Sequence, residues 1–78
     1  MEVYIVTEET IYMENNHEIN FSVEVFRQLE KAQECKEKMI NEVKQTFGED
    51  GEITINSNQW RIESGYDSIT IALMQQEI

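Results

Sequence analysis

The chain has few of the residue types on which disulfides and metal sites depend. Its 78 residues include no proline, three glycines, one cysteine and one histidine. A single cysteine, Cys35, excludes an internal disulfide and fits a reducing compartment. The only histidine, His17, lacks the further His or Cys ligands that a zinc site requires. The sequence therefore predicts a cytoplasmic protein with no metal site and no cofactor.

Basic residues are scarce and unevenly placed. Six Lys and Arg stand against sixteen Asp and Glu, which gives a net charge of −10. Residues 1–26 contain six acids and no base, whereas residues 27–47 hold five of the six bases. Direct binding to nucleic acid needs clustered Lys and Arg to neutralise phosphates, and binding to an anionic membrane needs the same. The partner predicted for such a chain is a protein with a basic surface.

Long apolar runs are also missing. No stretch approaches the length that crosses a bilayer, and Glu2 stands where a secretory signal would begin with a basic residue. The length predicts a single domain over residues 1–78. A chain of this size buries only about 60% of its unfolded surface. Its core is expected to be thin, and a homodimer would extend it.

One continuous segment, residues 27–47, contains neither glycine nor proline. At 100° per residue, its apolar side chains form a stripe. The stripe consists of Leu29, Ala32, Met39, Ile40, Val43 and Phe47. The pattern predicts an amphipathic helix that covers one side of a sheet, with Gly48 as its C-cap. Lys36 lies within the stripe, either as a stem that extends to water or at the floor of a pocket.

Short alternating segments flank this helix. Residues 2–7, 19–25, 52–56, 59–63 and 69–74 have the period of strands, and residues 11–13 form a short strand or cover an edge. Residues 8–10 interrupt the first pattern. The predicted fold is α+β, in the order ββ(α)βββ, with one helix on a four- to five-stranded, mostly antiparallel sheet.

The alternation also predicts which side of each strand the helix covers. We expect the helix to cover the side that includes Val3, Ile5, Ile19, Phe21 and Val23. The opposite side would then expose an apolar patch of about 200–300 Å², large enough to mark an interaction site. This predicted oligomer face consists of Tyr4, Val6, Ala72 and Met74.

The acidic residues near the predicted turns suggest a function. They form a predicted acidic edge that consists of Glu8, Glu9, Glu14, Glu18, Glu49, Asp50 and Glu52. Carboxylates spread in this way can stand in for phosphates and steer a basic, nucleic-acid-binding partner into contact. In composition the chain resembles small acidic inhibitors from phages and mobile elements. We therefore predict a non-enzymatic protein-interaction module that acts as a nucleic-acid mimic.

Two other functions remain open, and catalysis is not predicted. One alternative is a structural homo-oligomer built through the oligomer face. The other is a small-ligand-binding domain with a site near Lys36 or Arg61. No catalytic residue is assigned, because the sequence shows no pair of carboxylates placed in a cleft and Cys35 lies mid-helix without a histidine partner.

Overall fold

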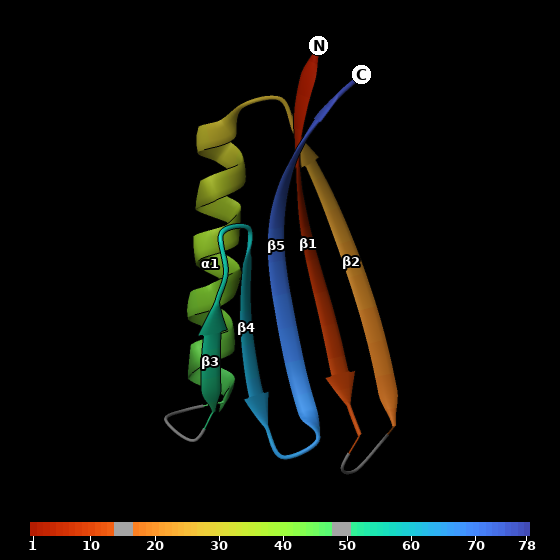
Figure 1. The fold of residues 1–78 in the computed structure, drawn as a ribbon, viewed down its shortest axis with the longest axis vertical. Coiled ribbons are helices and arrows are strands. Elements are labelled where there is room, and N and C mark those ends of the chain that lie inside the picture. Colours follow the sequence, from red (N-terminus) through yellow and green to blue (C-terminus); the bar gives the residue numbers. More distant parts are fainter. Residues whose placement is uncertain (14–16, 48–50) are drawn as a thin grey trace.

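The computed structural model describes residues 1–13, 17–47 and 51–78, which form one sheet and one helix (Figure 1). The elements are β1 (Glu2–Tyr12), β2 (Glu18–Phe26), α1 (Leu29–Phe47), β3 (Glu52–Ile55), β4 (Gln59–Ser64) and β5 (Asp67–Glu77). The strand order is β2-β1-β5-β4-β3, and each neighbouring pair is antiparallel. The predicted fold class and the order ββ(α)βββ are confirmed. Gly48, the predicted C-cap, lies outside the described residues.

β1 is longer than the sequence predicted. Residues 8–10 continue the strand instead of interrupting it, and residues 11 and 12 belong to the same strand. The physical reason is position, because β1 lies between β2 and β5 and pairs with both through this region. Two ladders of backbone hydrogen bonds keep polar residues extended where their own pattern would not.

The two ends of the chain also pair. The Met1 amino group donates to the Ile78 carbonyl at 3.1 Å, and the Ile78 amide donates to the Met1 carbonyl at 2.8 Å. β5 therefore runs to Glu77, three residues beyond the strand predicted over residues 69–74.

Tight turns join the last three strands. Between β3 and β4, the Asn56 amide donates to the Gln59 carbonyl at 2.9 Å. Between β4 and β5, Ser64 pairs with Asp67 around Gly65, whose φ of 63° is left-handed. Glycine adopts that conformation without a steric penalty, which suits a two-residue hairpin loop.

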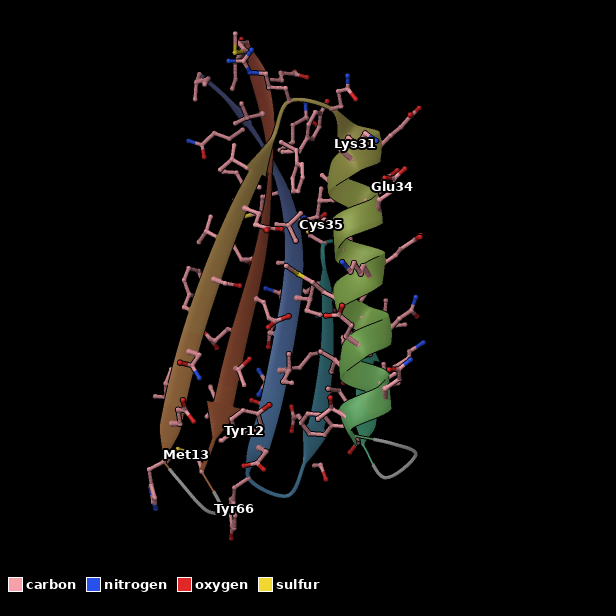
Figure 2. The ribbon with its side chains drawn as sticks, turned by 180° about the vertical axis from the view of Figure 1, so that it is seen from behind. Tyr12, Met13, Lys31, Glu34, Cys35 and Tyr66 are labelled. Atoms are coloured by element: carbon pink, nitrogen blue, oxygen red, sulfur yellow. The ribbon has the colours of Figure 1, made fainter. Side chains whose placement is uncertain are left out.

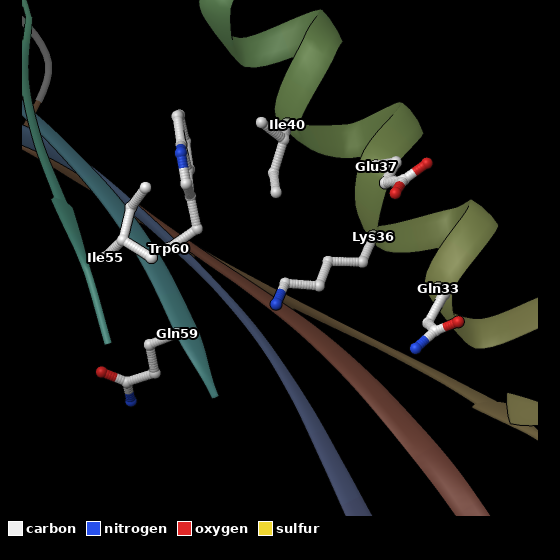
Figure 3. A pocket seen from close by; sticks show the side chains of 7 residues that line it. All are labelled: Gln33, Lys36, Glu37, Ile40, Ile55, Gln59 and Trp60. Atoms are coloured by element: carbon white, nitrogen blue, oxygen red, sulfur yellow. The ribbon is translucent and has the colours of Figure 1, made fainter. Parts of the chain in front are cut away.

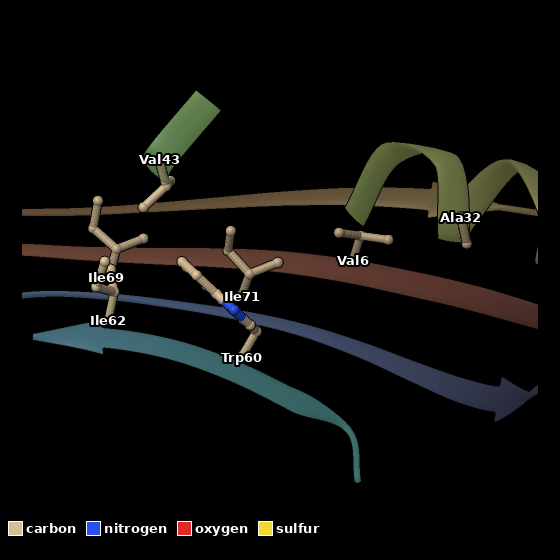
Figure 4. Packing of buried hydrophobic residues seen from close by; sticks show 7 residues of the cluster. All are labelled: Val6, Ala32, Val43, Trp60, Ile62, Ile69 and Ile71. Atoms are coloured by element: carbon tan, nitrogen blue, oxygen red, sulfur yellow. The ribbon is translucent and has the colours of Figure 1, made fainter. Parts of the chain in front are cut away.

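The core lies between α1 and one face of the sheet. It consists of Val6, Ala32, Val43, Trp60, Ile62, Ile69 and Ile71 (Figure 4). The helix contributes Ala32 and Val43, and the strands contribute the larger side chains. Partly buried residues, among them Tyr4, Phe26 and Leu73, pack around this cluster. The core is thin, as expected for one helix on one sheet.

The predicted facing of β1 and β2 is wrong. Val6 is fully buried in the core and Tyr4 packs against it, so neither residue lies on the exposed face. β1 is apolar on both sides, and alternation alone cannot say which side meets the helix. Phe26 decides the facing of β2, because it packs on the core from the last position of the strand. Side chains alternate along a strand, so the odd-numbered residues of β2 point away from the helix.

Candidate functional site: the open face of the sheet

β2 is apolar on the side that faces away from the helix. Ile19, Phe21, Val23 and Val25 are 68%, 63%, 51% and 60% exposed, respectively. The other side of the strand carries polar groups, namely Glu18, Asn20, Ser22 and Glu24. A strand usually buries its apolar side against the protein's own core. β2 does the reverse.

The position of β2 explains how this arrangement is tolerated. β2 is an edge strand, at the opposite side of the sheet from β3 (Figure 1), and nearly all of its residues are exposed. The helix makes more of its close backbone contacts with β5 and β1 than with β2. The polar side of β2 therefore borders a partly open gap beside the helix, while its apolar side extends the uncovered face of the sheet.

The neighbouring strands continue the apolar surface on this uncovered face. Val25 lies opposite Ile5, and Ile5 lies opposite Met74. In the next row across the sheet, Val23, Thr7 and Ala72 are side by side. Residues directly opposite each other share a face. We call this surface the open-face cluster, and it consists of Ile5, Phe21, Val23, Val25, Ala72 and Met74.

A charged row borders the open-face cluster. Phe21, Glu9, Thr70 and Arg61 lie in one line across β2, β1, β5 and β4. They surround a shallow hollow of about 370 Å³ together with parts of the cluster. The Arg61 guanidinium donates from Nε to Glu63 Oε1 at 2.7 Å. The cluster itself is uncharged, and charges of both signs stand at its border.

The structure does not gather the predicted acidic edge on one surface. Glu8 and Glu9 project from opposite faces of β1. Glu18 begins β2 and Glu52 begins β3, which are the two opposite edges of the sheet. Glu14, Glu49 and Asp50 lie outside the described residues.

The gap between α1 and β2 holds the Cys35 thiol, and the half-buried Glu8 lies on the neighbouring strand β1. Cys35 lies on the side of α1 that faces the sheet, and its Sγ donates to Glu24 Oε2 at 2.8 Å (Figure 2). Burial first, and the Glu24 carboxylate second, raise the pKa of Cys35 to about 11. Burial and the nearby charge of Glu42 also raise the pKa of Glu8. Both groups are held in their neutral forms more strongly than in water.

Lys36 lines a second hollow, of about 410 Å³, between α1 and the β3–β4 side of the sheet (Figure 3). Its side chain extends toward the sheet beside Trp60, and Gln33 and Gln59 lie at the rim. Arg61 is not part of this hollow, because it projects from the opposite face. Lys36 and Arg61, which the sequence suggested as alternative locations of a ligand site, therefore line two separate hollows.

Four members of the open-face cluster were missed by sequence reasoning, namely Ile5, Phe21, Val23 and Val25. The other two members, Ala72 and Met74, were predicted on this face; Ala72 is buried there and Met74 is 47% exposed. The signal for the others was Phe26, an apolar residue out of step with the alternation of β2 and only three positions before the helix. An anchor at that position fixes which side of the strand turns toward the helix.

Three further properties bear on function: metal binding by the described residues, the apolar length of the helix and likeness to known proteins. Within residues 1–13, 17–47 and 51–78, no three His, Cys, Asp or Glu side chains are close enough to hold a metal ion together. The helix that the structure describes is too short in apolar length to span a bilayer. Comparisons with protein-family models, with curated proteins and with solved structures find no match for this chain.

Proposed function

We propose that this chain is a non-enzymatic protein-interaction module that binds through the open face of its sheet. The observation that carries the proposal is the outward facing of the apolar side of β2. Water-exposed apolar surface is unfavourable by about 25 cal/mol per Å², so covering this face releases free energy. Binding, rather than catalysis, suits a broad apolar surface whose hollow beside Arg61 is shallow and open to solvent.

The anatomy of the face resembles that of protein interfaces. Interfaces have an apolar centre depleted of charge, aromatic and Met side chains within it, and a polar rim. Here Phe21 and Met74 lie within the uncharged cluster, and Glu9, Gln59 and Arg61 stand at its border. This distribution supports contact with another protein surface.

The proposal is tested by affinity capture of partner proteins from a lysate of the native host, with two matched variants of the chain as bait. Phe21→Lys places a charge on the open face, whereas Asn20→Lys places the same charge one residue away on the other side of β2. Partners retained by Asn20→Lys but lost with Phe21→Lys are expected. A partner set that is unchanged by Phe21→Lys would contradict binding through this face.

Carboxylate contacts with a basic partner stay as a second proposal. Its support is the uneven charge, since β1 and β2 contain no Lys or Arg and carry exposed Glu9 and Glu18. Such binding should weaken as salt is raised, because the attraction between exposed charges is screened. A complex with a basic nucleic-acid-binding protein that ignores salt would remove this mechanism.

A further inference from the structure

We infer that the open face is covered by a second copy of this chain, with the two sheets packed face to face and the two helices outside. This inference rests on the proposed function and names the partner for the same surface. The resulting dimer has four layers, in the order helix, sheet, sheet, helix. The open-face cluster of one copy lies against that of the other.

The size of the exposed surface supports a dimer. The exposed fractions of the cluster members Phe21, Val23, Val25 and Met74, together with the adjoining Ile19 on the same side of β2, correspond to roughly 500–600 Å² of accessible surface, at the upper end for a single apolar patch on a monomer. A stable interface buries about 600–1,000 Å² on each partner. The polar row beside the cluster supplies the remainder, so one face of this sheet matches what a dimer needs.

The shape of the surface fits a sheet. Packed sheets align their strands within about 30° and interdigitate the side chains of their inner faces over about 10 Å. The inner faces in such sandwiches consist of alternate residues of neighbouring strands. β2, β1 and β5 present just this arrangement, with rows that combine large residues such as Phe21 and Met74 with small ones such as Ala72.

Charge explains why a second copy is suited to this place. The cluster carries no charge, so the net charge of −10 does not oppose contact at its centre. The bordering row holds one carboxylate, Glu9, and one guanidinium, Arg61, two strands apart. In a two-fold interface each patch meets its own counterpart, so the acidic side of one row can meet the basic side of the other. Such a contact would join the Arg61–Glu63 ion pair that each copy already contains.

Sedimentation equilibrium of the full chain from low to high micromolar concentration tests the inference. Phe21→Lys is expected to raise the dimer dissociation constant about 100-fold, because two copies of the substitution enter each interface. The variant chain still folds on this view, since Phe21 is mostly exposed and the new ammonium lies opposite Glu9. Asn20→Lys, which changes the net charge equally, is expected to leave the dissociation constant within about threefold.

The effect of salt on affinity provides a second test, because salt should change the affinity in opposite directions for the two proposed modes of binding. Two copies of an acidic chain repel each other, so raising the salt concentration should tighten the dimer. Binding of a basic partner through the carboxylates should instead weaken as the salt concentration is raised. A dimer that dissociates on addition of salt would overturn the face-to-face arrangement.

Cross-linking locates the contact independently of affinity. In a Cys35→Ser background, Met74→Cys is expected to form dimers with a short bismaleimide, whereas Asn20→Cys is not. A dimer linked through Asn20→Cys, or one that Phe21→Lys leaves intact, would overturn the inference. So would a wild-type chain that is monomeric at every concentration. In that last case, a captured partner lost with Phe21→Lys would leave the proposed function standing with a different protein as the occupant.

Discussion

The Cys35 thiol donates a hydrogen bond to the Glu24 carboxylate across the gap between α1 and β2, with 2.8 Å between Sγ and Oε2. This contact joins the helix to an edge strand whose residues are nearly all exposed. The contact also lowers the reactivity that we expect of the Cys35 thiol. Burial and the neighbouring carboxylate together raise the pKa of Cys35 to about 11, so the reactive thiolate is rare at neutral pH.

We predict that Glu24→Gln makes Cys35 more reactive. The substitution removes the negative charge next to the thiol, although burial, the larger cause, continues to hold the pKa above its ordinary value. The measurement is the rate of iodoacetamide alkylation as a function of pH. Glu34→Gln is the matched control, because Glu34 pairs with Lys31 on the outer side of the helix. Equal rates in the two variants would contradict the contact with Glu24.

The same thiol predicts a loss of stability at high pH. Its pKa is higher in the folded chain than the ordinary value of 9.0, so the stabilisation is complete below pH 9. It is lost as the pH rises from 9 to about 11. As the pH rises from 9 to about 11, the free energy of unfolding should therefore fall less for Cys35→Ala than for the wild type. Denaturant unfolding at several pH values measures the difference, and parallel curves would contradict it.

Glu8→Gln should stabilise the chain at neutral pH. Burial and Glu42 raise the folded-state pKa of Glu8, so its contribution to stability is present below the unfolded pKa and is lost as the pH rises. The variant should gain about 0.5 kcal/mol at pH 7, a small value because the side chain is still largely solvated. The gain should vanish near pH 3.5. Glu9→Gln, on the exposed face, controls for net charge, and a pH-independent gain in both variants would refute the role of burial.

Gly51 is predicted to be intolerant of a side chain. A Cβ atom at this position would lie 2.5 Å from Cδ1 and Cγ1 of Ile62, which is itself buried in the core. Gly51→Ala should cost about 1–3 kcal/mol, the usual cost of overpacking. Ile62→Val shortens the opposing side chain and makes room for the new methyl group. The double variant should therefore lose less free energy of unfolding than the sum of the losses in the two single variants. If the losses of stability measured by thermal unfolding simply add, residue 51 and Ile62 are not in close contact.

The sequence predicted the elements well because their signals are local. The helix is marked by an uninterrupted apolar stripe, and Ile53, Trp60 and Ile69 alternate clearly within their strands. The facing of β1 was not predictable in the same way, since both of its sides are apolar and only the packing of Val6 beneath Ala32 selects one. Alternation determines which residues of a strand share a side, and tertiary contacts determine where that side points.

The candidate site was missed for the same reason. An apolar side of a strand is normally assigned to the core, so Phe21 and Val23 were expected beneath the helix. The acidic edge failed in a different way, because nearness in sequence places Glu8 and Glu9 on opposite faces of β1. Charge counts predict the overall potential of a chain, but register decides which carboxylates share a surface.

The facing of β1 and β2 leads to a final prediction that compares two valines. Val6 is fully buried against the helix and Val23 is half exposed on the open face. Val6→Ala should cost about 2 kcal/mol, through lost burial and the cavity that remains. Val23→Ala should cost less than about 0.5 kcal/mol, as most exposed substitutions do.

Urea unfolding in the Phe21→Lys background measures both valine substitutions without a contribution from self-association. With the wild-type face, Val23→Ala would also weaken dimerisation. The measured cost of Val23→Ala would then include this loss, and the difference between the costs of Val6→Ala and Val23→Ala would be smaller. Equal costs for the two valines in this background would mean that β2 buries its apolar side within the monomer. The open-face cluster would then be part of the core, and no surface would remain for a partner to cover.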